Sequence, residues 1–330
     1  MKKITVIGGG TGTATVLSAL SNDNKFDLTA IVSVSDSGGS TGRLRDEFGF
    51  IPVGDIRQCL SALATGKNSQ RVKEMLLYRF DKGDGLKGHN LGNLILTALT
   101  DLYQTPGKAI EVASKILRIN GRVYPISEKA NDLVITYEDG TKIVGEDYLN
   151  FKENSGKKII QIDLLHQSEI YRKAKMAIMN AEVVIMGPGD LYASLLPHTR
   201  VNGFKEALQN CSGKFVYIAN LMTCLQQTHQ MTASEHLSEI VKYCQREPDY
   251  IVLNQEKITD QQVIANYQAE GYEPLIDDLH DLPGPIKIIR ENLVSPVVVK
   301  KEKGDNLPRN FLRHHSENLK KVIRKISEEN

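Results

Sequence analysis

Short, nearly continuous apolar runs alternate along the chain with longer stretches whose apolar positions recur every three to four residues. The runs Ile4–Ile7, Leu28–Val34 and Val183–Met186 have the length and β-branched content of strands that are buried on both faces. Helical patterns lie between such runs, for example Thr13–Leu20, where Val16, Leu17 and Leu20 share one face. Strands that alternate with helices predict an α/β fold, with a mostly parallel sheet and helices on both of its faces.

This alternation is interrupted between about residues 121 and 163. Two β-rich runs flank Asp139-Gly140, and Asp-Gly between alternating apolar residues is a strong hairpin signal. The α/β pattern then resumes and ends in a charged helix at about 316–327. We therefore predict a single domain over residues 1–330 that carries a small β-hairpin insertion at about 121–163.

Charge, apolar run lengths and cysteine spacing argue against several classes of protein. Lys and Arg number 41 and Asp and Glu 40, so bulk charge gives no reason to expect nucleic-acid binding. No run approaches the roughly 20 apolar residues of a membrane span, and the first apolar run is too short for a signal peptide. The four cysteines form no C-x-x-C pair and have no His cluster beside them. We expect a cytoplasmic protein without a membrane span.

Glycine-rich loops follow three of the predicted strands, at Gly8–Gly12, Asp36–Arg43 and Gly187–Asp190. The carboxyl ends of parallel strands meet at one edge of a sheet, where ligands bind. Glycine lets the backbone turn its N–H groups toward a ligand, and helix N-termini favour anions. Three such loops at one edge predict a phosphate-bearing ligand. The residues assigned to this site from these loops and from the end of the next strand are Gly8, Gly9, Gly10, Thr11, Gly12, Asp36, Ser40, Gly187, Pro188, Gly189, Asn220 and Thr223.

The first loop does not complete the dinucleotide fingerprint G-x-G-x-x-G, because Thr13 or Thr15 stands where the third glycine belongs. We therefore expect a nucleotide diphosphate here and neither NAD nor FAD. Asp36 lies roughly where dinucleotide folds place a ribose-binding acid, yet it begins its own Ser/Gly loop. It is open whether Asp36 faces a ribose, a substrate hydroxyl or Mg²⁺, or only forms a turn.

Polar residues at two further helix starts are candidates for the same pocket. Asp55 either offsets the helix dipole or faces the ligand, while Arg57 carries a guanidinium that suits phosphate or carboxylate. Asn90 is either a helix N-cap or, with His89 and Asn93, part of the pocket wall. The motif H-E-x-x-H and the P-loop lysine pattern do not occur in the sequence.

Six motifs in one order carry a family resemblance. They are VIGGGTGTATVLSAL, SDSGGSTGRLRDEF, PVGDIRQCLSAL, GHNLGNLILTAL, VVIMGPGDLYASLLP and YIANLMT. Together they resemble the family that joins the YvcK-type gluconeogenesis factors of bacteria with the CofD-type 2-phospho-L-lactate transferases. The β hairpin and the segment FLRHHSENLKKVI are similar to the YvcK branch.

The resemblance implies a Rossmann-like core, a cytoplasmic location and a homodimer. Its transferase branch moves a phospholactyl group from a guanosine-diphosphate donor to a deazaflavin precursor, with Mg²⁺. Its YvcK branch binds UDP-sugars such as UDP-N-acetylglucosamine and is tied to cell shape and envelope synthesis during gluconeogenic growth, with no established reaction. Envelope-synthesis proteins or a kinase are the partners that this branch suggests.

The resemblance also implies residue roles. The nucleotide phosphates meet Gly8–Gly12 and Gly187–Gly189, and Asp36 and Asp55 are the candidates for binding Mg²⁺ and for catalysis. A tyrosine and an arginine that help hold the UDP-sugar correspond to Tyr267 and Arg313.

The sequence departs from the family pattern at two places. Asp190 stands where the family usually has Ser, and an acid beside a diphosphate is unfavourable unless Mg²⁺ or an arginine intervenes. The segment Cys224–Thr228 replaces the usual Gln, Pro, Gly, Glu and Thr that follow the last motif.

Two functions follow from the sequence. The favoured one is a regulatory protein that binds a UDP-sugar without turnover, and the alternative is a Mg²⁺-dependent transferase similar to the 2-phospho-L-lactate enzymes. We expect no tightly bound cofactor, with Mg²⁺ arriving together with a nucleotide diphosphate.

Overall fold

The computed structural model describes residues 1–150, 154, 156–280, 284–296 and 312–329. Its centre is a seven-stranded sheet in the order β12-β10-β8-β7-β1-β2-β3. Each neighbouring pair in this sheet is parallel, so the predicted α/β class is confirmed. The strands are β1 (Lys2–Gly8), β2 (Phe26–Val32), β3 (Arg122–Pro125), β7 (Val183–Met186), β8 (Lys214–Ile218), β10 (Tyr250–Asn254) and β12 (Lys287–Glu291).

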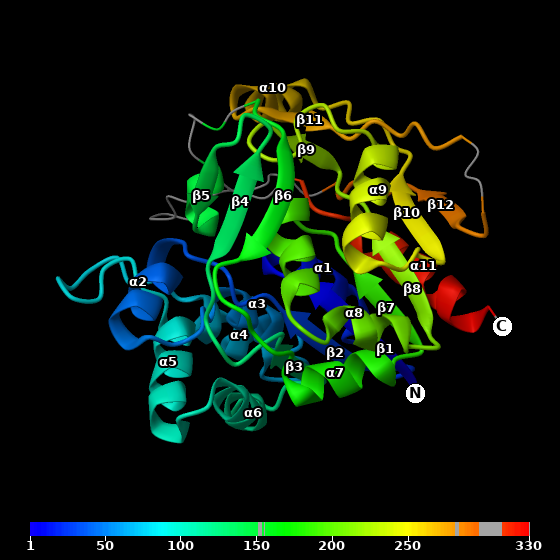
Figure 1. Cartoon of the computed structure of the whole chain (residues 1–330). Helices are drawn as coiled ribbons and strands as arrows, with labels where there is room; N and C mark the ends of the chain where they lie inside the picture. The colour runs from blue at the N-terminus through cyan, green and yellow to red at the C-terminus, as the bar shows by residue number, and fades with distance from the viewer. Residues whose placement is uncertain (151–153, 155, 281–283, 297–311, 330) are drawn as a thin grey trace.

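Helices cover both faces of the sheet, as the alternating pattern predicts (Figure 1). On one face α1 (Gly10–Leu20) packs against α3 (Gly54–Ala62) and α11 (Ser316–Glu328). The other face carries α7 (Arg172–Met179), α8 (Phe204–Gln209) and α9 (Ala233–Cys244). This arrangement explains why β1 is apolar at every position from Ile4 to Ile7 except Thr5, since side chains on both sides of the strand are buried.

The remaining helices flank the two ends of the sheet. At the β3 end, α6 (Pro106–Ile116) contacts β3, α5 (Leu91–Tyr103) packs against α6, and α4 (Ser69–Leu77) and α2 (Gly39–Phe48) pack against α5. The start of α5 is fixed by Asn90, whose side chain accepts a hydrogen bond from the Gly92 N–H at 2.9 Å. At the other end α10 (Gln261–Ala269) lies beside β11 (Tyr272–Pro274), which pairs antiparallel with β9 (Met222–Cys224).

The insertion forms a separate antiparallel sheet of β4 (Leu133–Tyr137), β5 (Lys142–Val144) and β6 (Ile159–Leu164). Its hairpin turns at Asp139-Gly140, as predicted, and Gly140 has the positive φ of 82° that such turns favour. The separate sheet begins at Leu133. At the start of the predicted range 121–163, Arg122–Pro125 instead form β3 and pair with β2 in the main sheet. Positions 151–153 and 155 of that range lie outside the described residues.

The strand order reverses direction between β1 and β7, because the chain first adds β2 and β3 on one side of β1 and later β7 and β8 on the other. Open α/β sheets bind ligands at this point, outside the carboxyl ends of the strands. The loops after β1 and β7 touch here. A Cβ atom built on Gly12 in the first turn of α1 would lie 2.0 Å from the Pro188 carbonyl oxygen. In the described part of the chain, no helix has the length and hydropathy of a membrane span.

We expect Gly12→Ala to destabilise the fold by about 1–3 kcal/mol, the usual cost of overpacking. Helix propensity alone favours Ala over Gly by about 1 kcal/mol, so the sign of the effect tests the contact with Pro188. The matched control is Gly85→Ala, since no atom lies within 4 Å of a Cβ built there. Urea denaturation compares the two variants, and an unchanged or raised free energy of unfolding for Gly12→Ala would contradict the close approach.

Candidate functional site

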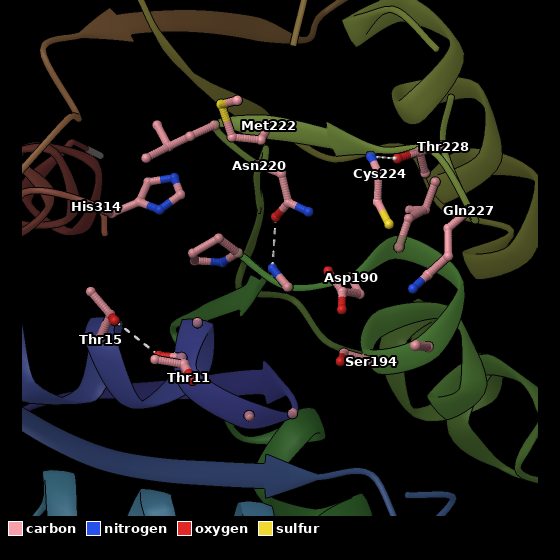
Figure 2. Close-up of a pocket in the computed structure, with 18 of the residues that line it drawn as sticks. Thr11, Thr15, Asp190, Ser194, Asn220, Met222, Cys224, Gln227, Thr228 and His314 are labelled. Carbon is pink, nitrogen blue, oxygen red and sulfur yellow. Dashed lines mark hydrogen bonds between the residues drawn. The ribbon is translucent and has the colours of Figure 1, made fainter. Parts of the chain in front are cut away.

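A cavity of about 290 Å³ lies at the carboxyl ends of β1, β7 and β8 (Figure 2). The loops that follow these strands and β2 form most of its wall. The insertion, α10 and the segment 312–314 complete the wall, although they are distant in sequence.

Eleven of the residues assigned from the sequence line this cavity. They are Gly9, Gly10, Thr11, Gly12, Asp36, Asp55, Pro188, Gly189, Asn220, Tyr267 and Arg313. The structure thus brings together the first and third glycine loops, the two candidate acids and the two residues that come from the resemblance.

The other assigned residues lie outside the cavity lining and serve local contacts. They are Gly8, Ser40, Arg57, His89, Asn90, Asn93, Gly187 and Thr223. The Ser40 hydroxyl and His89 Nδ1 lie 3.1 Å apart, and Asn93 donates to the Thr41 hydroxyl at 3.3 Å. Thr223 donates to the Glu273 carbonyl, so its side chain joins β9 to β11.

Asn90 has the N-cap role that is one of its two predicted alternatives, whereas Arg57 lies outside the cavity lining. Asn90 caps α5 and donates to the Leu77 carbonyl at 3.0 Å, which ties α4 to α5. Arg57 is buried and lies 3.4 Å from the Leu76 carbonyl. Its positive charge nevertheless acts on the cavity. It opposes the effect of burial, which raises the pKa values of both Asp36 and Asp55.

The first glycine loop holds a carboxylate against the start of α1. A Cβ atom on Gly9 would lie 2.5 Å from Asp55 Oδ2, so only glycine leaves room for this acid. Gly10 begins α1 with a positive φ of 62°. Thr13, which stands at the place of a fingerprint glycine, is buried and fills the space beside Gly8. The N-terminus of α1 therefore meets Asp55, and an incoming phosphate would share this place with a negative charge.

Four carboxyl groups line the cavity, and all four have raised pKa values. Burial raises the pKa of Asp55 to about 7, and the nearby Asp36 adds to the rise. Burial likewise raises the pKa of Asp36 to about 6, against a hydrogen bond of 2.9 Å from the Gly38 N–H. Burial is the leading cause of the raised pKa of Glu146, with repulsion from Asp36 next, and it is also the cause for Asp190. The cavity therefore concentrates negative charge that has little water to stabilise it.

The insertion supplies Glu146 to this cluster. The turn that contains it docks on the second glycine loop through a hydrogen bond of 3.0 Å from the Asp147 N–H to the Ser37 hydroxyl. An ion pair between Arg45 and Asp132, at 2.8 Å, makes a second link between α2 and the residues just before β4. No motif in the sequence indicates Glu146, since its place depends on how a separate sheet folds back over the main one.

The donor set suits a hard divalent cation, which prefers carboxylate and phosphate oxygens. Within the described residues, however, no three His, Cys, Asp or Glu side chains are already arranged around one metal position. Mg²⁺ is commonly bound by one or two carboxylates together with substrate phosphates. The acids fit a cation that binds with a phosphate ligand rather than one in a closed protein cage.

Asn220 and Gln58 fix the positions of the two glycine loops. Asn220 Oδ1 accepts a hydrogen bond of 2.9 Å from the Gly189 N–H, so its amide group joins the end of β8 to the loop after β7 (Figure 2). Gln58 accepts from the Thr11 hydroxyl at 3.3 Å and lies 3.4 Å from Asp55 Oδ1. Gln58 is one turn after Asp55 on α3, a helical spacing that could have indicated it from the sequence.

Tyr267 of α10 and Arg313, which follows β12 in the chain, both line the cavity. The Tyr267 hydroxyl accepts a hydrogen bond of 2.8 Å from the Leu312 N–H. This contact joins α10 to the segment 312–314 and leaves the ring buried. Arg313 lines the cavity and also donates to the Leu312 carbonyl at 3.1 Å.

Comparisons with known proteins agree on one family. The family profile described as 2-phospho-L-lactate transferase CofD matches residues 4–294. The chain is 38% identical over 283 residues to the gluconeogenesis factor of Halalkalibacterium halodurans, which covers 85% of this chain and 86% of the relative. It is also 36% identical over 325 residues, 98% of this chain and 99% of the relative, to a Thermotoga maritima protein that is provisionally named a gluconeogenesis factor.

A solved structure shows that the similarity extends to the whole fold. A crystal structure of a Bacillus halodurans protein of the UPF0052 family matches with a TM-score of 0.88 and 35% identity, and the match covers 98% of both chains. The chain therefore belongs to the CofD family, in the group whose bacterial relatives are named gluconeogenesis factors.

Proposed function

We propose that the protein binds a nucleoside diphosphate sugar of the UDP-N-acetylglucosamine kind, together with a divalent cation, and acts as a regulatory protein in the cytoplasm. The proposal includes a link to cell shape and envelope synthesis during gluconeogenic growth and a homodimeric state. One observation carries the binding proposal: two glycine loops meet at the point where the strand order reverses, around a cavity lined by four carboxyl groups.

The loops supply the phosphate-binding part of this proposal. The first turn of α1 has backbone N–H groups without intrahelical partners, and the helix dipole favours an anion there. Because Asp55 lies against Gly9, a diphosphate would meet repulsion unless a cation lies between them. The cavity thus supports binding of the diphosphate and the cation as a pair.

Asp36 and Asp55 are the residues that would hold Mg²⁺, with Glu146 and Asp190 in the same wall. When bound, Mg²⁺ would neutralise the diphosphate oxygens and the carboxylates at once. The carboxyl groups themselves then have to lose their protons, because a carboxylate binds the cation only in its charged form. Their raised pKa values therefore make cation binding dependent on pH.

A specific observation also favours transfer chemistry as a second function. A pKa of about 7 would let Asp55 accept a proton from an attacking hydroxyl near neutral pH, as a general base must. Cys224 and His314, which also line the cavity, are less suited, because burial raises the pKa of Cys224 to about 11 and lowers that of His314 to about 4. The relatives are named gluconeogenesis factors, which names no reaction, whereas the description of the family profile supports the transferase function.

Calorimetric titration distinguishes these functions. We expect UDP-N-acetylglucosamine to bind in the presence of Mg²⁺ and to remain intact when phosphorus NMR follows the mixture for hours. Consumption of a guanosine-diphosphate donor in the same assay would favour the transferase. Absence of UDP-sugar binding at millimolar ligand would refute the binding proposal.

We expect Asp55→Asn to bind the UDP-sugar more tightly than the wild type when Mg²⁺ is removed by a chelator, by about tenfold or about 1.4 kcal/mol. The substitution removes the charge that repels the phosphates, so added Mg²⁺ should improve affinity less than in the wild type. Asp101→Asn is the control, because it removes the same charge from an exposed position on α5. Equal dependence on Mg²⁺ in the wild type and Asp55→Asn would show that Asp55 does not face the cation.

The raised pKa of Asp55 predicts how stability depends on pH. In the unfolded chain an aspartate titrates near pH 3.9, and in the folded protein Asp55 titrates at about pH 7. Between these values the folded state binds more protons, so rising pH lowers the free energy of unfolding until Asp55 is fully ionised. The slope is at most about 1.4 kcal/mol per pH unit for one proton.

Thermal unfolding of the ligand-free protein at pH 5, 6, 7 and 8 tests this dependence. Buried His198, His236 and His314 have lowered pKa values of about 4 and give the opposite trend between about pH 4 and 6.5, so each pH is compared with Asp55→Asn. We expect the variant to become more stable relative to the wild type as pH rises. Parallel curves for the two proteins would contradict the raised pKa.

A further inference from the structure

The segment 312–314 is held rigidly at the wall of the cavity. The Leu312 N–H donates to the Tyr267 hydroxyl at 2.8 Å, and the Ser295 N–H donates to the Arg313 carbonyl at 2.8 Å. The His315 N–H donates to the Leu293 carbonyl at 2.7 Å. Hydrogen bonds on both sides of His314 therefore fix its backbone, and its side chain has a defined direction.

The imidazole of His314 has one defined tautomer. The ring lines the cavity but is only 7% exposed, and Nε2 lies 3.1 Å from the Ala219 carbonyl oxygen. A carbonyl oxygen only accepts, so Nε2 carries the proton and donates. Burial lowers the pKa of His314 to about 4, against the Ala219 hydrogen bond and with help from Arg313, so the ring is neutral at physiological pH. In a neutral ring with a proton on Nε2, Nδ1 is an acceptor.

This acceptor has no partner among the described residues, although its side chain is more than nine-tenths buried. Figure 2 shows the ring at the same side of the cavity as Asn220 and Met222, directed toward the space above Thr11 and Thr15. Nδ1 lies at the cavity surface, where water reaches it before a ligand binds. A ligand that displaces this water without supplying a donor leaves the acceptor unpaired, which is an energetic penalty. A ligand that brings a donor to Nδ1 removes this penalty, whereas a ligand that brings another acceptor keeps it.

The neighbouring wall is mainly apolar. Leu221, Met222, Pro188 and Leu312 line the cavity together with His314, and the polar side chains beside them are Asn220 and Arg313. Of the four carboxyl groups, only Asp190 comes from the same loop as Pro188. Ligand sites typically combine apolar walls for a flat group with a few polar atoms that set its orientation. A nucleobase matches this wall, with its diphosphate toward the glycine loops and the acids.

We propose that His314 is a specificity-determining residue that accepts a hydrogen bond from the ring N–H beside a carbonyl group of the base, as in uracil. This inference rests on the nucleotide binding proposed above and adds the group that selects the base. Cytosine has a ring nitrogen with a lone pair at the same position, so two acceptors would face each other. An adenine ring presents the same mismatch.

Titration of the full-length protein with UDP and CDP, each with Mg²⁺, tests the inference. We expect UDP to bind at least tenfold more tightly than CDP, and N3-methyluridine diphosphate to bind as weakly as CDP because it lacks the donor. His314→Asn places an amide near the position of Nδ1, and an amide presents either its oxygen or its NH₂ group. This variant should therefore bind CDP more tightly than the wild type does, a gain that unfolding cannot produce.

The possible failures are distinguishable. If neither UDP nor CDP binds, the proposed nucleotide function is refuted and the inference falls with it. If UDP, CDP and N3-methyluridine diphosphate bind equally to the wild type, nucleotide binding stands and the role of His314 is refuted. A loss of affinity with 2′-deoxyuridine diphosphate but not with the N3-methyl analogue would also overturn the inference, since the donor would then be a ribose hydroxyl. Unchanged CDP affinity in His314→Asn would remove His314 as the selecting residue.

Discussion

The site depends on the close approach of two backbone segments at the centre of the sheet. The first turn of α1 lies against the loop after β7, and at Gly12 the approach leaves no room for a Cβ atom beside the Pro188 carbonyl. This contact is possible only because β1 and β7 are parallel neighbours that end at the same level, with Ile7 opposite Met186. The other parts of the cavity wall, which come from α3, the insertion, α10 and the segment 312–314, surround these two loops.

The same approach determines the electrostatics of the site. Asp55 can lie against Gly9 because that position has no side chain. Burial and the nearby Asp36 then disfavour ionisation, which explains why the pKa of Asp55 reaches about 7. A loop geometry that attracts phosphate is thus combined with acids that repel it. On the proposed function, a divalent cation lies between the carboxylates and the phosphates and removes their repulsion. The affinity for the phosphate ligand then depends on the cation, and the affinity for the cation depends on the phosphate ligand.

Local sequence signals were sufficient for the fold and for part of the site. The strand runs, the Asp139-Gly140 hairpin and the Asn90 cap each depend on neighbouring residues, and the structure contains all three. The three glycine loops were placed at one edge because parallel strands share it, a rule that needs no tertiary detail. No comparable rule places short polar side chains such as those of Ser40 and Asn93. In the structure these side chains contact His89 and Thr41 outside the cavity lining.

Glu146 and His314 could not be predicted as residues of the site, for a physical reason. Glu146 reaches the cavity because the insertion docks on Ser37, and His314 because a late segment is tied to Tyr267 and Leu293. The contacts with Ser37 and Tyr267 join residues more than 40 positions apart, and none of these contacts leaves a periodicity or a spacing in the sequence. The range predicted for the insertion began at 121 for the same reason, since only the pairing of β3 with β2 shows that its first residues belong to the main sheet.

The cavity is built partly from loops early in the chain and partly from the late segment 312–314. This difference suggests how one family can include both transferases and gluconeogenesis factors. The parts that would bind a diphosphate and a cation are built into the sheet edge, where a change disturbs the contact of α1 with the β7 loop. The segment 312–314 is tied to α10 and to residues 293–295 through its backbone groups, so these ties do not depend on the side chains of Arg313 and His314. Selection of the base can therefore diverge while the phosphate site stays constant. On this view the cavity has two parts under different constraints, and His314 belongs to the part that is free to vary.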